Sequence, residues 1–219
     1  MNTAVKPSGT YAVMAQRHEP HDSLDFFPTP PWATRALCEH VLIGGGWRRD
    51  QLAAQTVWEP ACGEGHMARP LTEYFERVRA TDCHPYGYGE VHDFLFAGSG
   101  WREDWIVTNP PFRLAAQFIG EARASCGVGV AMLVRSTFLE GVERYRNLFS
   151  TSPPAIVAPF AERVPMVKGR LDKTASSATA YSWLVWSKAP HHCGQTRVRW
   201  IPPCRAKLER DADYRGEVA

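Results

Sequence analysis

The chain has little that would take it into or across a membrane. No stretch approaches the roughly 18 uninterrupted apolar residues that a membrane span needs, and the N-terminus lacks the apolar block of a secretory signal. Internal repeats and low-complexity tracts are also missing from the sequence. Because 44% of the 219 residues are hydrophobic and 22% are charged, we expect a soluble, cytoplasmic protein built on one compact domain.

Cysteine is sparse as well. The six cysteines are scattered through a chain that is large enough to build its own core, which favours reduced thiols over a disulfide framework. Two groups, Cys83-His84 and residues 191–193 with Cys204, contain metal-ligand types but lack the paired short spacings of a structural zinc site. We therefore expect no metal.

The charge balance gives only a weak indication of a partner. A formal net charge of +2 does not mark a nucleic-acid binder, although Arg and Lys become denser over residues 197–210. Residues 1–24 are polar and aperiodic, which predicts a flexible N-terminal arm. We expect the folded domain over residues 25–190 and a basic C-terminal tail over 191–219, which either stays in solvent or contacts nucleic acid.

Between these ends, short apolar runs alternate with segments of helical spacing. The expected strands cover residues 56–60, 78–82, 105–108, 128–134, 155–160 and 179–188. The expected helices cover residues 32–41, 66–77, 114–124 and 141–149. This alternation is typical of an α/β fold, and the continuous apolar run over 128–134 suits a mostly parallel sheet buried on both faces.

The first candidate binding motif is EPACGEG over residues 59–65, where a strand runs into a turn with two glycines. Glycine lets the backbone pass close to a ligand, and nucleotides bind at the carboxyl ends of strands in doubly wound sheets. Asp82 ends the next strand, at the offset from which a carboxylate accepts hydrogen bonds from ribose hydroxyls. The alternatives are an ordinary glycine turn and a cap by Asp82.

The second motif is NPPF over residues 109–112, directly after an apolar strand. The prolines remove two backbone donors, so the side-chain oxygen of Asn109 and the carbonyl of Pro110 become fixed acceptors beside the ring of Phe112. A planar amine fits this arrangement, because it donates one hydrogen to each acceptor while its ring stacks on Phe112, as an extruded base does. The alternative is a surface turn.

Together the two motifs resemble those of the amino-group (N6-adenine) DNA methyltransferases. Residues 109–112 match that family's catalytic pattern, Asp/Asn/Ser-Pro-Pro-aromatic, and residues 59–65 match its cofactor pattern, Asp/Glu-Pro-x-Cys-Gly-x-Gly. The resemblance implies a Rossmann-like fold with a mostly parallel seven-stranded sheet, one antiparallel strand and helices on both faces. It implies S-adenosylmethionine as the cofactor and adenine N6 in DNA as the acceptor, with Asn109, Pro110, Pro111 and Phe112 as the catalytic residues.

Two further segments support the resemblance. Residues 25–30 (DFFPTP) match the segment that precedes the cofactor motif in the γ arrangement of the family, and residues 92–95 (HDFL) match its third motif. In the third motif, Asp93 would meet the amino group of the cofactor's adenine and Phe94 its ring. The residues implied to bind the cofactor are Phe26, Phe27, Pro28, Thr29, Glu59, Pro60, Ala61, Cys62, Gly63, Gly65, Asp82, Asp93 and Phe94.

Fewer residues match the positions that contact the DNA substrate in this family. Phe160 resembles the aromatic that helps to sandwich the target base in this family, although a core phenylalanine is the alternative. Lys168, Arg170 and Lys173 lie in a long polar loop and would contact phosphate, which positions DNA without reading its sequence.

Few residues follow the last expected strand, where enzymes of this family usually carry the domain that recognises the DNA sequence. Only about thirty residues follow Lys188, too few for the target-recognition domain that usually accompanies a γ enzyme. We therefore expect a short sequence read by loops, a partner subunit that supplies specificity, or low specificity as in phage-borne and mobile-element modification enzymes.

Two other functions stay open on the sequence alone. The same chemistry would serve an amino group in RNA or the amide of a protein glutamine, since each offers a planar NH2 group. A non-catalytic nucleic-acid-binding subunit is a different class of protein. The joint presence of Glu59, Asp82 and Asn109 favours an enzyme, because a binding module has no need of both halves of the site.

Overall fold

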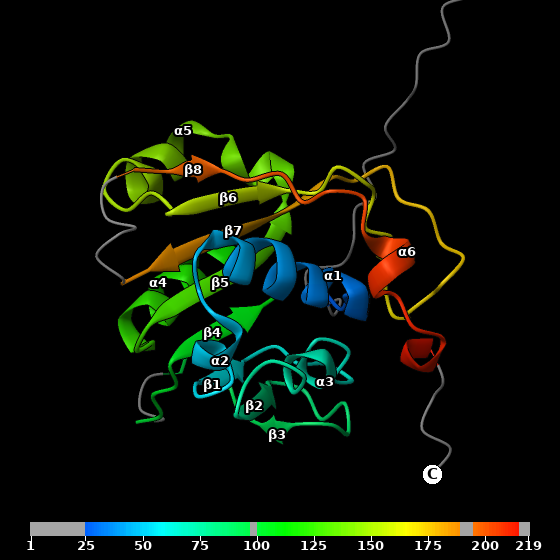
Figure 1. Cartoon of the computed structure of the whole chain (residues 1–219). Helices are drawn as coiled ribbons and strands as arrows, with labels where there is room; N and C mark the ends of the chain where they lie inside the picture. The colour runs from blue at the N-terminus through cyan, green and yellow to red at the C-terminus, as the bar shows by residue number, and fades with distance from the viewer. Residues whose placement is uncertain (1–24, 97–99, 189–194, 215–219) are drawn as a thin grey trace, which may run out of the picture.

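The computed structural model describes residues 25–96, 100–188 and 195–214 (Figure 1). The arm expected over residues 1–24 and the cluster at 191–193 lie outside the described residues. None of the described helices is long and apolar enough to cross a membrane.

One eight-stranded sheet forms the centre of the described structure, with the strand order β3-β2-β1-β4-β5-β7-β6-β8 (Figure 1). The strands are β1 (Thr56–Glu59), β2 (Arg77–Asp82), β3 (Glu90–Val91), β4 (Trp105–Thr108), β5 (Gly129–Arg135), β6 (Ile156–Pro159), β7 (Tyr181–Ser187) and β8 (Arg197–Val198). All neighbouring strands pair in parallel except β7, which runs antiparallel to both β5 and β6. The expected α/β fold with one antiparallel strand is therefore confirmed.

The strand count differs slightly from the expected seven. The difference comes from β8, a two-residue strand that pairs in parallel with β6 at one edge of the sheet. At the opposite edge, β3 is also only two residues long. Strands this short leave almost no periodic pattern. The six strands expected from the apolar runs are therefore the longer ones, whereas the number seven was what the family resemblance implied.

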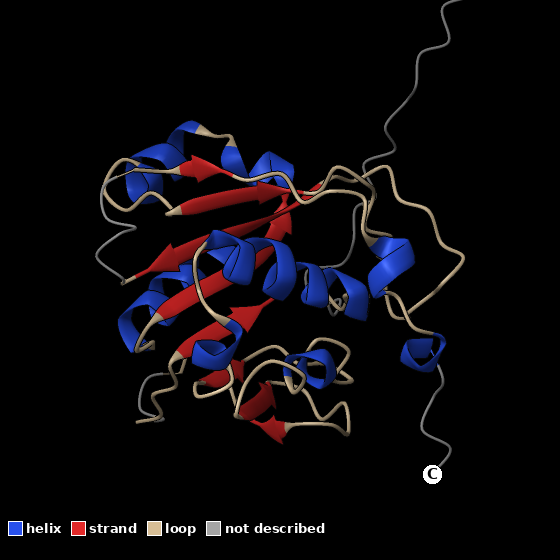
Figure 2. Cartoon of the chain, in the orientation of Figure 1, coloured by secondary structure: helices blue, strands red, loops and turns tan. Residues whose placement is uncertain are grey.

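The sheet is buried on both faces, as its apolar strands predict. In β5, Ala131 and Leu133 belong to one core cluster, whereas Val130, Met132 and Val134 belong to the other. The first cluster packs against the helix that begins at Pro31, and the second packs against the helix that begins at Ala115. Figure 2 shows helices on both sides of the strands.

The helices are short and several continue into π or 3-10 turns, labelled η. They are α1 (Pro31–Ala36), η1 (Leu37–Leu42), η2 (Ile43–Gly45), α2 (Arg49–Leu52), α3 (Ala68–Leu71), α4 (Ala115–Ser125), η3 (Ser136–Leu139), α5 (Val142–Arg144), η4 (Tyr145–Phe149), α6 (Arg205–Leu208) and η6 (Asp211–Tyr214). Three of the four expected helices are present. The helix expected over 66–77 is wrong in its second half: it ends at Leu71, and Arg77 already begins β2.

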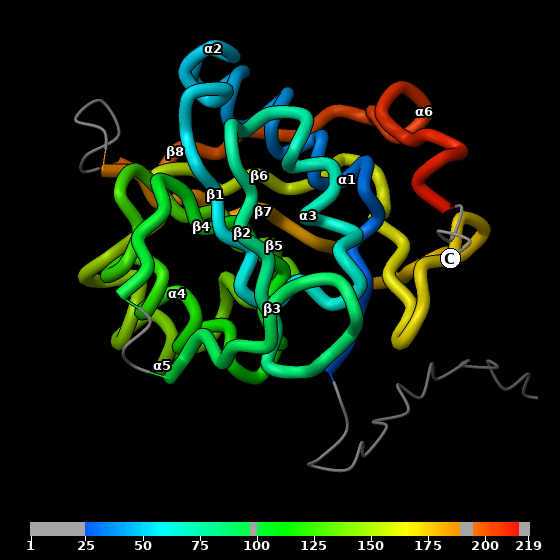
Figure 3. The backbone as a smooth tube through the Cα atoms, turned by 90° about the horizontal axis from the view of Figure 1, so that it is seen from below, coloured from blue at the N-terminus to red at the C-terminus, as the bar shows by residue number. Residues whose placement is uncertain are grey.

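Residues 201–208 pack into the first core cluster, and the tube in Figure 3 shows α6 near the N-terminal half of the chain. Ile201 is fully buried and Cys204 is 3% exposed. The buried guanidinium of Arg35 in α1 donates hydrogen bonds to both carboxylate oxygens of Asp213 and to Glu73. The boundary expected near residue 190, between the folded domain and a basic tail, stays a prediction. The described residues beyond it, 195–214, contribute β8 to the sheet and Asp213 to the buried ion pair with Arg35.

Candidate active site

The candidate site lies where three neighbouring parallel strands end. Glu59 ends β1, Asp82 ends β2, and Asn109 follows β4 directly. Because carboxyl ends of parallel strands meet at one edge of a sheet, these three side chains border one pocket, of about 430 Å³. That volume falls in the range of roughly 300–1,000 Å³ that is usual for small-molecule sites.

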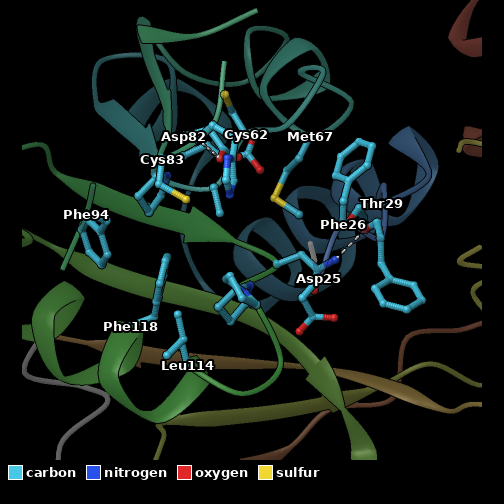
Figure 4. A pocket seen from close by; sticks show the side chains of 18 of the residues that line it. Asp25, Phe26, Thr29, Cys62, Met67, Asp82, Cys83, Phe94, Leu114 and Phe118 are labelled. Carbon is cyan, nitrogen blue, oxygen red and sulfur yellow. Dashed lines mark hydrogen bonds between the residues drawn. The ribbon is translucent and has the colours of Figure 1, made fainter. Parts of the chain in front are cut away.

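The pocket collects most of the residues that the sequence singles out. Its wall includes residues 26–29, 59–62, 82, 93–94 and 109–112. In Figure 4, Cys62, Asp82 and Cys83 lie along one side, Phe94, Phe118 and Leu114 along another, and Phe26, Thr29 and Asp25 along a third. Segments far apart in the sequence therefore form one continuous wall, while their roles stay predictions.

Gly63 and Gly65 are not among the residues that line the pocket, although their neighbours Cys62 and His66 are. Both have positive φ angles, 51° and 82°, which L side chains rarely adopt. A Cβ atom at Gly63 would come within 2.4 Å of the ring of Phe26, and one at Gly65 within 2.5 Å of the ring of Tyr88. The two glycines thus let aromatic side chains lie directly on the turn that carries the cofactor motif.

Glu59 is the most deeply buried acidic residue of the pocket. It is 2% exposed, and its Oε2 atom has no hydrogen-bond partner within the described part of the chain. Burial, and next the negative charge of Asp82, hold the pKa of Glu59 well above its usual value. An orphaned buried oxygen of this kind is costly, so it indicates a site prepared for a donor or a cation.

Asp82 orders the backbone around the turn. Its Oδ2 atom accepts a hydrogen bond from the backbone N–H of Gly63 at 2.9 Å, and its Oδ1 atom accepts one from His84 at 3.0 Å. A carboxylate oxygen can accept more than one hydrogen bond, so contact with a ribose remains chemically open. Asp82 thus caps the loop that follows β2, which is the alternative that the sequence left open, and it also holds the glycine turn; its contact with a ribose stays a prediction.

Asn109 has one end of its amide fixed and the other end free. Its Nδ2 atom donates to the backbone carbonyl of Phe27 at 3.0 Å and lies 3.7 Å from the sulfur of Met166. Its Oδ1 atom is buried without a hydrogen-bond partner among the described residues. The donor end thereby fixes the amide orientation, and the unpaired acceptor belongs to a residue of the pocket wall.

Phe112 is held by a residue that the sequence did not single out. The backbone N–H of Phe112 is the first donor after the two prolines, and it donates to Oδ2 of Asp25 at 2.6 Å. The ring of Phe112 lies 5.1 Å from that of Phe27, tilted by 42°. Asp25 is the first residue of the matched segment 25–30, to which the resemblance gave no role of its own, so its place in that segment was the available signal.

The far end of the pocket is aromatic. Phe94 is 4% exposed and lies 5.0 Å from the rings of both Trp58 and Phe118. Asp93 is exposed, and its Oδ1 atom accepts a hydrogen bond from the backbone of Leu95. The matched third motif therefore supplies one buried ring and one carboxylate at the rim.

Other pocket residues were not expected from the sequence. Besides Asp25, they are His66, Met67, Cys83, His84, Tyr86, Leu95, Arg113, Leu114 and Phe118. Four of them, His66, Cys83, Leu95 and Arg113, directly follow an expected residue, so adjacency to the motifs was the available signal for these four. Tyr86 stacks on Phe26 with ring centroids 4.6 Å apart, which closes the side of the pocket beside Gly63.

The residues expected to contact substrate do not line the pocket. Phe160 packs edge-on against Trp32 with ring centroids 5.7 Å apart. Lys168 and Arg170 are exposed, and the loop that carries them is joined to the pocket wall because Gly169 donates a backbone hydrogen bond to Phe26. Lys173 forms an ion pair with Asp211, which ties the same loop to the C-terminal segment.

Neither metal chemistry nor thiol chemistry stands out in the described residues. No group of three or more His, Cys, Asp or Glu side chains there is arranged to hold a metal ion. Five cysteines are free thiols, and Cys62 is the buried one in the pocket wall. Burial, followed by the charges of Glu59 and Asp82, raises the pKa of Cys62 to about 12, so this thiol is neutral, and its part in cofactor binding stays a prediction.

Comparison with known proteins gives a fold rather than a family. No protein-family model matches the chain, and no curated protein sequence matches it significantly. A proposed RNA methyltransferase from Pyrococcus horikoshii aligns with a TM-score of 0.54 and 15% identity, over 78% of this chain and 90% of its own. The methyltransferase subunit of a type I restriction-modification system from Streptococcus thermophilus aligns with a TM-score of 0.58 and 10% identity, over 86% of this chain.

A third structure, the modification subunit of a proposed type I restriction enzyme from Vibrio vulnificus, has a TM-score of 0.50 and 15% identity, over 87% of this chain. The chain covers only 51% and 50% of the two type I subunits, so it spans about half of their length. At these identities the likeness establishes architecture alone. The chain has the α/β fold of methyltransferases.

Proposed function

We propose that the protein transfers a methyl group from S-adenosylmethionine to an exocyclic amino group, and that adenine N6 in DNA is the acceptor. The observation that carries this proposal is the state of Asn109. Its amide nitrogen is fixed by the carbonyl of Phe27, and its oxygen is buried without a partner among the described residues, on a residue of the pocket wall. Such an oxygen is an acceptor that awaits an N–H donor.

The residues present fit the proposed cofactor. The orphaned oxygen of Glu59 and its proximity to Asp82 suit a positively charged ligand, and the turn at Gly63 brings the backbone close to the pocket. Phe94 offers a buried ring, and Phe26 to Thr29 line the same cavity. S-adenosylmethionine supplies a methyl group on a positively charged sulfur, which makes that methyl group electrophilic.

On the acceptor side, the chain provides orientation rather than a strong base. Asn109 Oδ1 and the carbonyl of Pro110 accept the two hydrogens of the target NH2 group, and the ring of Phe112 stacks on the base. Two such hydrogen bonds disfavour delocalisation of the nitrogen lone pair into the ring and direct it towards the methyl donor. Fixed geometry of this kind supplies most of the acceleration in a reaction that needs no strong base.

The choice of DNA over RNA or protein rests on the motif resemblance. The order of the matched segments, from residues 25–30 through 59–65 to 109–112, is that of the γ arrangement of DNA enzymes. The similar folds include a proposed RNA methyltransferase and two restriction-modification subunits, so they favour neither nucleic acid. Because this chain spans about half of those subunits, we include a specificity partner in the proposal.

The test is to identify the methylated product. Purified protein is incubated with S-adenosylmethionine labelled in its methyl group and with unmethylated DNA, RNA in a parallel tube and a glutamine-containing protein in a third. The nucleic acids are digested to nucleosides and the labelled nucleoside is identified. The Asn109→Ala protein, purified in the same way, controls for contaminating enzymes.

Label in N6-methyldeoxyadenosine with the wild-type protein alone supports both the reaction and the acceptor. Label confined to RNA or protein keeps the reaction and rejects the acceptor. Failure to bind S-adenosylmethionine rejects the proposal and favours a non-catalytic nucleic-acid-binding subunit.

A further inference from the structure

Arg135 belongs to neither motif and is not itself among the residues that line the pocket, but it lies against Phe112, which does line it. It is the last residue of β5, which pairs in parallel with β4 in the register Thr108 to Met132. The carboxyl ends of β4 and β5 are therefore adjacent, and Arg135 reaches the loop that carries Asn109 and Phe112. Its guanidinium carbon is 3.9 Å from the ring centroid of Phe112 and 5.9 Å from that of Phe27.

The short distance fixes where the guanidinium lies. An approach at 3.9 Å within the plane of the ring would overlap the ring atoms, so the guanidinium lies over a face of Phe112. Phe112 packs against the first core cluster, whereas Arg135 is exposed. The guanidinium thus covers the face of Phe112 that opens to solvent, and this is the face on which a base arriving from outside would stack.

The other contacts of Arg135 leave its charge available. Besides the two phenylalanine rings, it lies beside the hydroxyl of Tyr181. Burial raises the pKa of Tyr181, and the charge and hydrogen bond of Arg135 oppose that rise. The described contacts of this guanidinium are thus with rings and a hydroxyl. The carboxylate of Asp25 acts on the same hydroxyl, but it accepts a hydrogen bond from the backbone of Phe112 and forms no described ion pair with Arg135.

We propose that Arg135 occupies the place of the target base in the free protein and binds a phosphate of the extruded nucleotide once the base has entered. The proposal rests on the proposed function, because it requires an acceptor that stacks on Phe112. Guanidinium and base are both planar and both stack on aromatic faces, so one can replace the other at little cost. A displaced arginine beside an extruded nucleotide is well suited to bind phosphate, since its fork of N–H groups matches phosphate oxygens.

The test compares Arg135→Ala and Arg135→Lys with a matched control, Arg146→Ala. Arg146 is an exposed arginine of η4 that pairs with Glu143 and, unlike Arg135, has no described contact with Phe112 or Phe27. Binding of a fluorescent DNA duplex is measured by anisotropy at several salt concentrations, and methylation kinetics are measured on unmethylated DNA. Thermal midpoints and S-adenosylmethionine affinity show whether each variant keeps its fold and cofactor site.

We expect Arg135→Ala to raise the KM for DNA about tenfold, with kcat within about threefold of wild type. The slope of log affinity against log salt should fall in magnitude by about one, since one phosphate contact is lost. Arg135→Lys should recover the salt slope but only part of the KM, because its ammonium does not stack as a plane. Arg146→Ala should leave all of these values near wild type.

The two proposals fail in different ways. A salt slope and DNA affinity for Arg135→Ala equal to those of Arg146→Ala overturn the role of Arg135, whatever the methylation result. A wild-type protein that binds S-adenosylmethionine but labels no acceptor overturns the proposed function, while the binding series still decides the phosphate contact.

Discussion

The two sides of the pocket differ in how many of their polar groups already have partners. On the side of β1 and β2, Asp82 accepts hydrogen bonds from the backbone of Gly63 and His84, and Phe26 lies directly on Gly63. On the side of β4, the oxygen of Asn109 has no partner among the described residues, and the guanidinium of Arg135 lies over the ring of Phe112. We infer that the first side is preformed and that substrate completes the second.

Glu59 is the exception on the preformed side. Its Oε2 atom is as unpartnered as the oxygen of Asn109 within the described residues. The difference is chemical, because a carboxylate responds to a charged ligand by changing its protonation, whereas an amide does not. The substitutions below change three positions in turn: the unpaired acceptor Asn109, the glycine turn at Gly63 and the buried carboxyl group of Glu59.

The largest effect is expected at Asn109. Asn109→Ala removes the unpaired acceptor, and we expect kcat to fall about a hundred- to a thousandfold with S-adenosylmethionine affinity retained, as for other preorganised catalytic hydrogen bonds. Asn109→Asp keeps an acceptor oxygen but loses the donor to the carbonyl of Phe27, so its activity should be intermediate. Single-turnover methylation and calorimetric cofactor titration measure the two quantities.

Asn147, which is exposed on η4, provides the matched control for the Asn109 variants. Asn147→Ala should retain wild-type rates. Unchanged methylation by Asn109→Ala would show that the acceptor is held elsewhere and would remove the distinction between the two sides of the pocket.

A smaller effect is expected at Gly63. In Gly63→Ala the new Cβ atom conflicts with the ring of Phe26 and with the positive φ angle, so S-adenosylmethionine affinity should fall about tenfold. The free energy of unfolding should fall by about 1–2 kcal/mol, measured by urea denaturation. Gly46→Ala is the control, since Gly46 also has a positive φ angle but nothing within 4 Å of the added atom.

Gly46→Ala should therefore lose stability without losing cofactor affinity. If both alanine variants bind S-adenosylmethionine as wild type does, the contact between the glycine turn and Phe26 is not part of the cofactor site, and the preformed side lies elsewhere.

The smallest effect is expected at Glu59 and depends on pH. Because the pKa of Glu59 is raised in the folded protein, the folded state keeps a proton that the unfolded state has lost. The free energy of unfolding should therefore fall as pH rises from about 4.3, the ordinary pKa of Glu, towards the raised pKa. Glu59→Gln, which resembles the protonated form, should lack this contribution in urea unfolding at pH 5 and pH 8.

The same group should couple protons to cofactor binding. A positively charged ligand favours the ionised form of Glu59, so S-adenosylmethionine binding should release a proton and strengthen several-fold as pH rises. Calorimetry in two buffers of different ionisation enthalpy measures that proton. Proton release that is equally large in Glu59→Gln would assign it to another group.

Sequence reasoning predicted most of the fold because the long strands carry their own pattern. The apolar runs that became β5 and β7 are buried on both faces, so nearly every residue in them is hydrophobic. The two-residue strands β3 and β8 left no such signal. The helix expected to reach Arg77 stops at Leu71, because spacing alone does not show where tertiary contacts take over.

The site was predicted where it consists of short motifs and missed where it depends on distant contacts. Residues 59–62 and 109–112 line the pocket because each follows directly from a strand end. Asp25 and Arg135 reach Phe112 from segments 87 residues before it and 23 residues after it. No spacing rule connects such positions, and only the pairing of β4 with β5 and the path of segment 25–29 bring them together.

The hydrogen bond from Asn109 to the carbonyl of Phe27 has a consequence for the order in which ligands bind. Residues 26–29 line the side assigned to the cofactor, yet the same segment sets the angle of the Asn109 amide. A ligand that steadies Phe27 therefore also steadies the acceptor oxygen, so we expect an ordered mechanism with S-adenosylmethionine bound first. Product-inhibition patterns with S-adenosylhomocysteine test this order, and a random pattern would show that the carbonyl of Phe27 keeps its position without the cofactor.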